Sequence, residues 1–158
     1  MSQHKRKLAA IVFTDIVGFT KLTADDQSKA SNLLTEQRNL LQPIVDSHNG
    51  SWIKEMGDGL LLIFDTVTDA VNCTIKIQET TKEINDLNLR IGIHQGEILL
   101  TENDVIGDDV NIAARIEPFA APGGIAISNK VNDALVRESG YDTKYVGKPK
   151  LKGVGQEV

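Results

Sequence analysis

The chain has 158 residues, 41% of them hydrophobic, and a formal net charge of −5. This length suffices for one packed core, so we expect residues 1–158 to form a single domain. The negative charge argues against a general nucleic-acid surface, and the single cysteine, Cys73, excludes an internal disulfide. No apolar run approaches the ~20 residues of a membrane-spanning helix, and no targeting segment is evident, which predicts a cytoplasmic protein without a membrane segment.

Strand and helix patterns alternate along the chain. We expect a strand over 8–13, a helix over 33–45, a hairpin of 51–56 and 60–64, a helix over 67–84, a strand over 89–94, a helix over 110–119, a strand over 125–128 and a helix over 130–137. Asn49-Gly50 ends the first of these helices, and Pro43 is expected to bend its last turns. The opening β-α-β-β-α-β order predicts an α+β fold with a ferredoxin-like antiparallel sheet, helices packed on it and C-terminal additions.

Carboxylates follow two of the expected strands. Asp15 comes directly after the first strand and before a turn at Gly18, while Asp58 lies in Gly57-Asp58-Gly59, between the two strands of the hairpin. Adjacent strands would bring Asp15 and Asp58 together. Such a pair beside free backbone N–H groups suits a magnesium-bound polyphosphate, because Mg²⁺ prefers hard oxygen ligands. Taken singly, an Asp after a strand and an Asp-Gly pair in a hairpin are also ordinary turn chemistry.

Two polar residues mark one face of a later helix. Asn111 and Arg115 are four residues apart, so both side chains project from the same face. An amide and a guanidinium aimed at one spot suit a phosphoryl group whose charge is changing. Arg115 can instead cap the helix or pair with Glu117, and Lys54 and Arg90 can each be solvated cations at strand ends.

Taken in order, these motifs resemble the catalytic domain of the class III nucleotidyl cyclases, which convert a nucleoside triphosphate to a cyclic monophosphate and pyrophosphate. The resemblance extends from about Lys7 to Gly155. The short segment between His94 and Asp104 is similar to that of the short-arm subgroup. The implied activity is that of an adenylate cyclase acting on ATP.

The resemblance also implies a role for each matching residue. Two divalent ions, Mg²⁺ or Mn²⁺, would be held by Asp15, Asp58 and the backbone carbonyl of Ile16. The phosphates would be bound by Arg90, Lys152 and the backbone N–H groups of Gly18, Phe19 and Thr20. Adenine would be read by Lys54 and Asp104, since a lysine donates to the ring N1 and a carboxylate accepts from the exocyclic amine, whereas guanine presents the reverse pattern. Asn111 would orient the ribose, and Arg115 would stabilise the transition state.

The family arrangement is a head-to-tail homodimer. In it, the metal ligands and Arg90 of one chain face the adenine pair, Asn111 and Arg115 of the other. Every residue type is present in this chain, so a homodimer would hold two complete sites and a monomer none. The resemblance also allows a regulatory domain outside this chain.

Two other interpretations of the sequence are an inactive cyclase-like module and a diguanylate cyclase. A catalytically inactive cyclase-like module would bind nucleotide or regulate a partner, and the presence of all six signature residues argues against it. A diguanylate cyclase is disfavoured because its Gly-Gly-acidic-acidic-Phe signature is absent: Gly123-Gly124 is followed by Ile125. We interpret His94 as a packed strand histidine and Cys73 as a small core residue.

Overall fold

The computed structural model describes residues 5–102, 104–138, 140–145, 147 and 158. The elements in these ranges are β1 (Lys5–Ile16), α1 (Phe19–Asp25), α2 (Gln27–Ser47), β2 (Gly50–Met56), β3 (Gly59–Phe64), α3 (Val67–Thr81), β4 (Leu89–Leu100), β5 (Val105–Ile106), α4 (Asp108–Ile116), the 3-10 helix η1 (Glu117–Phe119), β6 (Ile125–Ile127) and α5 (Asn129–Leu135). In the part of the chain that the structure describes, every helix is too short or too polar to cross a membrane.

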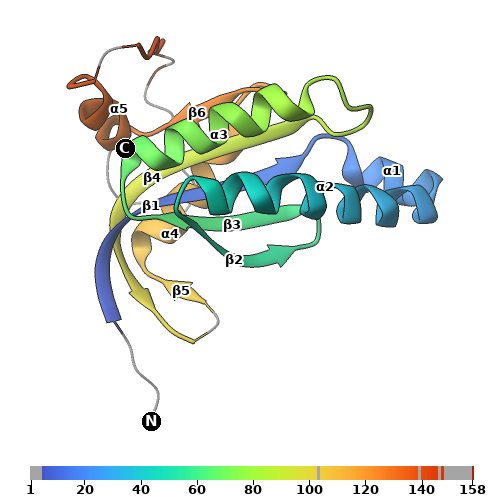
Figure 1. Ribbon diagram of the computed structural model, residues 1–158, viewed down its shortest axis with the longest axis horizontal. Coiled ribbons are helices and arrows are strands. Elements are labelled where there is room, and N and C mark those ends of the chain that lie inside the picture. Colours follow the sequence, from blue (N-terminus) through green and yellow to red (C-terminus); the bar gives the residue numbers. More distant parts are fainter. Residues whose placement is uncertain (1–4, 103, 139, 146, 148–157) are drawn as a thin grey trace.

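One sheet organises the molecule (Figure 1). Its strand order is β2-β3-β1-β4-β5 with antiparallel neighbours, and β6 pairs with β4. The expected α+β fold with its βαββαβ unit is confirmed. Two features differ from the expected all-antiparallel sheet: β6 is parallel to β4, and β5 is a strand of two residues, too short to leave a periodic pattern.

The two faces of the sheet are covered by different helices. Along β1, Ala10 and Val12 belong to a core that includes α2, α3 and α5, while Ala9 and Ile11 belong to a second core that includes α4. Successive strand residues point to opposite faces, so α4 lies on the face away from α2 and α3. Figure 1 shows α2 and α3 lying across the same side of the sheet.

Helix α2 begins six residues before the expected 33–45 segment and ends near the predicted Asn49-Gly50 turn. The side chain of Asp26 accepts a hydrogen bond from the backbone N–H of Lys29 at 3.0 Å, which caps the helix start. Pro43 does not end the helix, which continues to Ser47. The chain then turns at Asn49, whose φ of 61° is left-handed, and enters β2.

Helix α4 and η1 lie unusually close to β4 because two residues of that strand are glycines. A Cβ atom at Gly92 would lie 2.5 Å from the backbone N and Cα of Glu117. A Cβ atom at Gly96 would overlap the carboxyl group of Asp109. The first and last turns of this helical segment therefore rest directly on the strand.

We expect Gly92→Ala to destabilise the fold, because the new methyl group meets backbone rather than a movable side chain. Overpacking of this kind costs about 1–3 kcal/mol of unfolding free energy. Urea denaturation followed by circular dichroism measures the loss. An unchanged midpoint would mean that η1 can lift from β4 without cost, and that the close approach is not a constraint.

Candidate active site

The two carboxylates predicted from the sequence lie at one end of the sheet. Asp15 is near the end of β1, and Asp58 is in the turn between β2 and β3. Because Thr14 pairs with Leu60, the end of β1 lies beside this turn. The Asp58 Oδ2 atom accepts a hydrogen bond of 2.8 Å from the backbone N–H of Ile16.

A pocket of about 610 Å³ opens at this end of the sheet. It is lined by Asp15, Ile16, Val17, Gly18, Phe19, Thr20, Lys21, Ala24, Asp58 and Arg90. Arg90 is the register partner of Asp15 on β4, which explains why it lies here. Gly18, at φ 78°, turns the chain into α1, and a side chain is disfavoured at that φ. All residues expected to bind metal, and all described residues expected to bind phosphate, thus line one cavity.

Lys21 is a pocket residue that the sequence analysis did not single out. It lies in the first turn of α1, a seven-residue helix without fully buried residues, which is too short to leave a long periodic pattern. Its only sequence signal is its position directly after the Gly18-Phe19-Thr20 turn. Lys21 adds a second cation to the pocket, beside Arg90.

Glu117 is a second residue that the sequence analysis missed in this role. Its side chain belongs to a residue that is only 7% exposed. Burial, and then a hydrogen bond with Asp15, raises the pKa of Glu117 to about 8, while the nearby Arg90 guanidinium opposes that rise. Glu117 is therefore protonated at neutral pH and can donate to Asp15. The sequence alone indicates Glu117 only as a partner for Arg115.

The donor atoms at Asp15 and Asp58 fit a hard divalent cation. Asp15 Oδ1 is buried without a hydrogen-bond donor from the described residues, and carboxylate oxygens are the ligands that Mg²⁺ and Mn²⁺ prefer. No group of three or more histidine, cysteine or acidic side chains suited to a metal is found in the described ranges. Further ligands would have to come from backbone carbonyls, water or phosphate oxygens.

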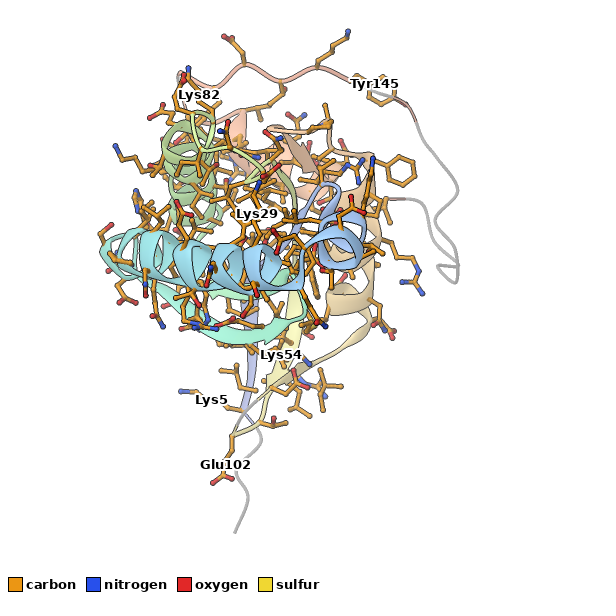
Figure 2. All side chains as sticks on the ribbon, turned by 90° about the vertical axis from the view of Figure 1, so that its right-hand side faces the viewer. Lys5, Lys29, Lys54, Lys82, Glu102 and Tyr145 are labelled. Carbon is orange, nitrogen blue, oxygen red and sulfur yellow. The ribbon has the colours of Figure 1, made fainter. Side chains whose placement is uncertain are left out.

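Lys54 and Asp104 form a second cluster. The Lys54 Nζ atom lies 3.0 Å from Asp104 Oδ2. This hydrogen bond, followed by one from the backbone N–H of Val105, holds the pKa of Asp104 below its usual value. Figure 2 shows Lys54 at the end of the molecule where the β4–β5 hairpin, with Glu102 at its tip, extends from the sheet. The pair thus joins β2 to the residue just before β5, and β2 and β5 are the two outermost strands of the sheet order.

Asn111 and Arg115 lie on the exposed side of α4, opposite its buried Ile112 and Ile116. Asn111 lines a smaller pocket of about 220 Å³ with residues at the start of α4 and in β5. Neither Asn111 nor Arg115 lines the pocket that contains Asp15. Lys152, the remaining predicted phosphate ligand, lies outside the described residues.

The raised pKa of Glu117 predicts a pH dependence of stability. The folded protein holds this proton more tightly than the unfolded chain, whose ordinary pKa is 4.5. The resulting stability is fully present below pH 4.5 and is lost as the pH rises to about 8. Between pH 5 and pH 8, the metal-free wild type should lose on the order of 1–2 kcal/mol more than Glu117→Gln. Urea unfolding in chelator measures this difference, and parallel pH profiles for the two proteins would refute the raised pKa of Glu117.

Comparison with known proteins places this geometry in a family. The chain matches the model of the adenylate and guanylate cyclase catalytic domain over residues 1–158. It is 35% identical over 162 residues to putative adenylate cyclase 3 of Rhizobium meliloti, and this match covers 98% of the chain but only 28% of that protein.

Solved structures of cyclase domains have the same fold as this chain. The adenylate/guanylate cyclase/hydrolase from Silicibacter pomeroyi superposes with a TM-score of 0.87 at 32% identity, over 98% of this chain and 95% of that one. The guanylyl cyclase Cya2 has a TM-score of 0.85 at 26% identity, over 99% of this chain and 91% of that one. The relatives thus include proteins named for either nucleotide. Since the family model and these relatives cover nearly the whole chain, the chain belongs to the class III adenylate and guanylate cyclase catalytic domains.

Proposed function

We propose that the protein is an adenylate cyclase that converts ATP to cyclic AMP and pyrophosphate at two composite sites of a head-to-tail homodimer. The observation that carries this proposal is the separation of the site residues into two groups. Asp15, Asp58 and Arg90 line one pocket, whereas Asn111 and Arg115 lie on another element, α4, and do not line that pocket. A second copy of the chain would supply the group that each pocket lacks.

The state of Lys54 and Asp104 supports adenine over guanine. The lowered pKa of Asp104 keeps its carboxylate ionised at neutral pH, so it accepts hydrogen bonds only. Lys54, held 3.0 Å from it, is a donor only. Adenine offers one acceptor, N1, beside one donor, the exocyclic amine, which matches this pair. Guanine offers the opposite pattern, so the Lys54 donor would face a donor and the Asp104 acceptor would face an acceptor.

Each remaining group has a place in the reaction, in which the ATP 3′-hydroxyl attacks the α-phosphorus and pyrophosphate leaves. Asp15, Asp58 and the carbonyl of Ile16 would hold two Mg²⁺ or Mn²⁺ ions, which lower the pKa of that hydroxyl and neutralise phosphate charge when bound. The turn at 18–20 would donate backbone N–H groups to the phosphates, with Arg90 and Lys152 beside them. Asn111 would orient the ribose, and Arg115 would stabilise charge that develops in the transition state.

A product assay tests the nucleotide and the reaction together. Purified protein is incubated with ATP or GTP and with Mg²⁺ or Mn²⁺, over protein concentrations that span dimerisation. We expect cyclic AMP from ATP, at a rate that rises more steeply than linearly with protein concentration. Measurable ATP binding without any cyclic product would instead identify a nucleotide-binding module, and preferential cyclic GMP formation would refute the adenine assignment.

Mixing two inactive variants tests whether the sites are shared. Asp15→Ala and Arg115→Ala should each be inactive alone. In a 1:1 mixture, half of the dimers are mixed and one of their two sites is intact, so about one quarter of the wild-type activity should return. The same mixture of Asp15→Ala with Asp58→Ala is the control, because both changes fall in the same half-site and no dimer regains an intact site. An absence of rescue at concentrations where dimers are detected by light scattering would refute shared sites.

A further inference from the structure

The imidazole ring of His94 joins three elements of the fold. His94 lies within β4 and is 2% exposed. Its Nε2 atom is 2.8 Å from Oδ1 of Asp109, the second residue of α4. Its Nδ1 atom is 2.7 Å from Oγ of Ser128, the residue that caps the start of α5. Both ring nitrogens are therefore bonded inside the protein.

Donors and acceptors can be assigned consistently along the hydrogen bonds that surround His94. Ser128 Oγ accepts from the backbone N–H of Val131 at 3.4 Å, so its own hydrogen is available to His94 Nδ1. The Nε2–H group then donates to the Asp109 carboxylate. The charged groups that face the ring are Asp109 on α4 and Lys130 on α5, and burial, the largest effect, lowers the pKa of His94. A neutral ring in a single tautomer satisfies every partner.

The bond to Asp109 acts on the helix that carries Asn111 and Arg115. Asp109 precedes Asn111 by two residues and Arg115 by six on the same short helix. The Asp109 carboxyl lies where a Cβ of residue 96 would be, so glycine at that position leaves room for it. Because α4 is stiff over nine residues, a shift at Asp109 moves the exposed groups of the whole helix.

We propose that His94 is a positioning residue which, through Asp109, sets where α4 presents Asn111 and Arg115 to a nucleotide bound by a second copy of the chain. This inference rests on the proposed function. A histidine that only fills the core would affect stability, whereas a positioning residue affects the step in which Arg115 acts. Misplacement of a catalytic group by about 1 Å can cost up to a hundredfold in rate.

Two substitutions at His94 separate the two ring bonds. Gln places its amide N–H near the position of Nε2 and keeps a donor for Asp109, whereas Asn places its amide near Nδ1 and loses Asp109. We expect His94→Asn to lower kcat by about tenfold or more with KM for ATP changed less than about twofold, because Arg115 stabilises the transition state. His94→Gln should keep kcat within about threefold of wild type. Asp109→Ala should match His94→Asn, and the double variant should be no worse than either single variant.

Ile77→Val is the matched control for lost stability, since Ile77 is fully buried in the core on the opposite face of the sheet. It should lower Tm without changing kcat. Equal kcat losses in His94→Asn and His94→Gln, or losses that follow Tm across all variants, would overturn the inference.

Amide hydrogen exchange of α4 gives a readout that does not need activity. Exchange at 111–115 should be faster in His94→Asn than in His94→Gln and Ile77→Val. If the wild type forms no cyclic nucleotide yet this difference is seen, the proposed function fails and the positioning of α4 by His94 stands. Equal exchange in the three variants would overturn the positioning role whatever the wild-type activity.

Discussion

The direct contact of α4 and η1 with β4 is the constraint on which the arrangement of the site depends. Residues paired across antiparallel strands share a face, so Asp15 and Arg90 lie on the same face as Phe13 and Gly92. That is the face that α4 and η1 cover, and they reach it because Gly92 carries no side chain. Glu117 is thereby placed beside Asp15, and the helix that bears Arg115 ends at this contact with the strand.

This contact has an electrostatic consequence at the pocket. Asp15, Asp58 and Glu117 lie near one another, and three carboxylates in a partly buried site would repel strongly. The raised pKa of Glu117 relieves this repulsion, because the protonated carboxyl carries no charge and can donate a hydrogen bond to Asp15. Arg90 and Lys21 then give the same pocket positive charge for an anionic substrate.

The sequence predicted those parts of the site that local pattern determines. The strand before Asp15, the hairpin around Asp58 and the helical spacing of Asn111 and Arg115 each follow from residues within about 15 positions of one another, and the structure places them accordingly. Glu117 and the His94–Asp109 bond were not foreseen, because they depend on how β4 meets η1 and α4. The four-residue spacing of Gly92 and Gly96, which puts both glycines on the same face of one strand, was the available signal of a close approach.

The proposed division of the site residues between two subunits also indicates where regulation of catalysis could act. In one chain, the sheet register positions the residues of the pocket with Asp15, and contacts at the two ends of α4 position that helix on β4. If the proposed function is correct, what can vary is the orientation of the two subunits relative to each other, while the geometry within each subunit stays the same. A contact that reoriented the copies would separate Arg115 from the α-phosphate without altering any pocket residue. Catalysis by such a dimer is therefore sensitive to weak forces between subunits, since the chemical groups themselves need not move within their own chains.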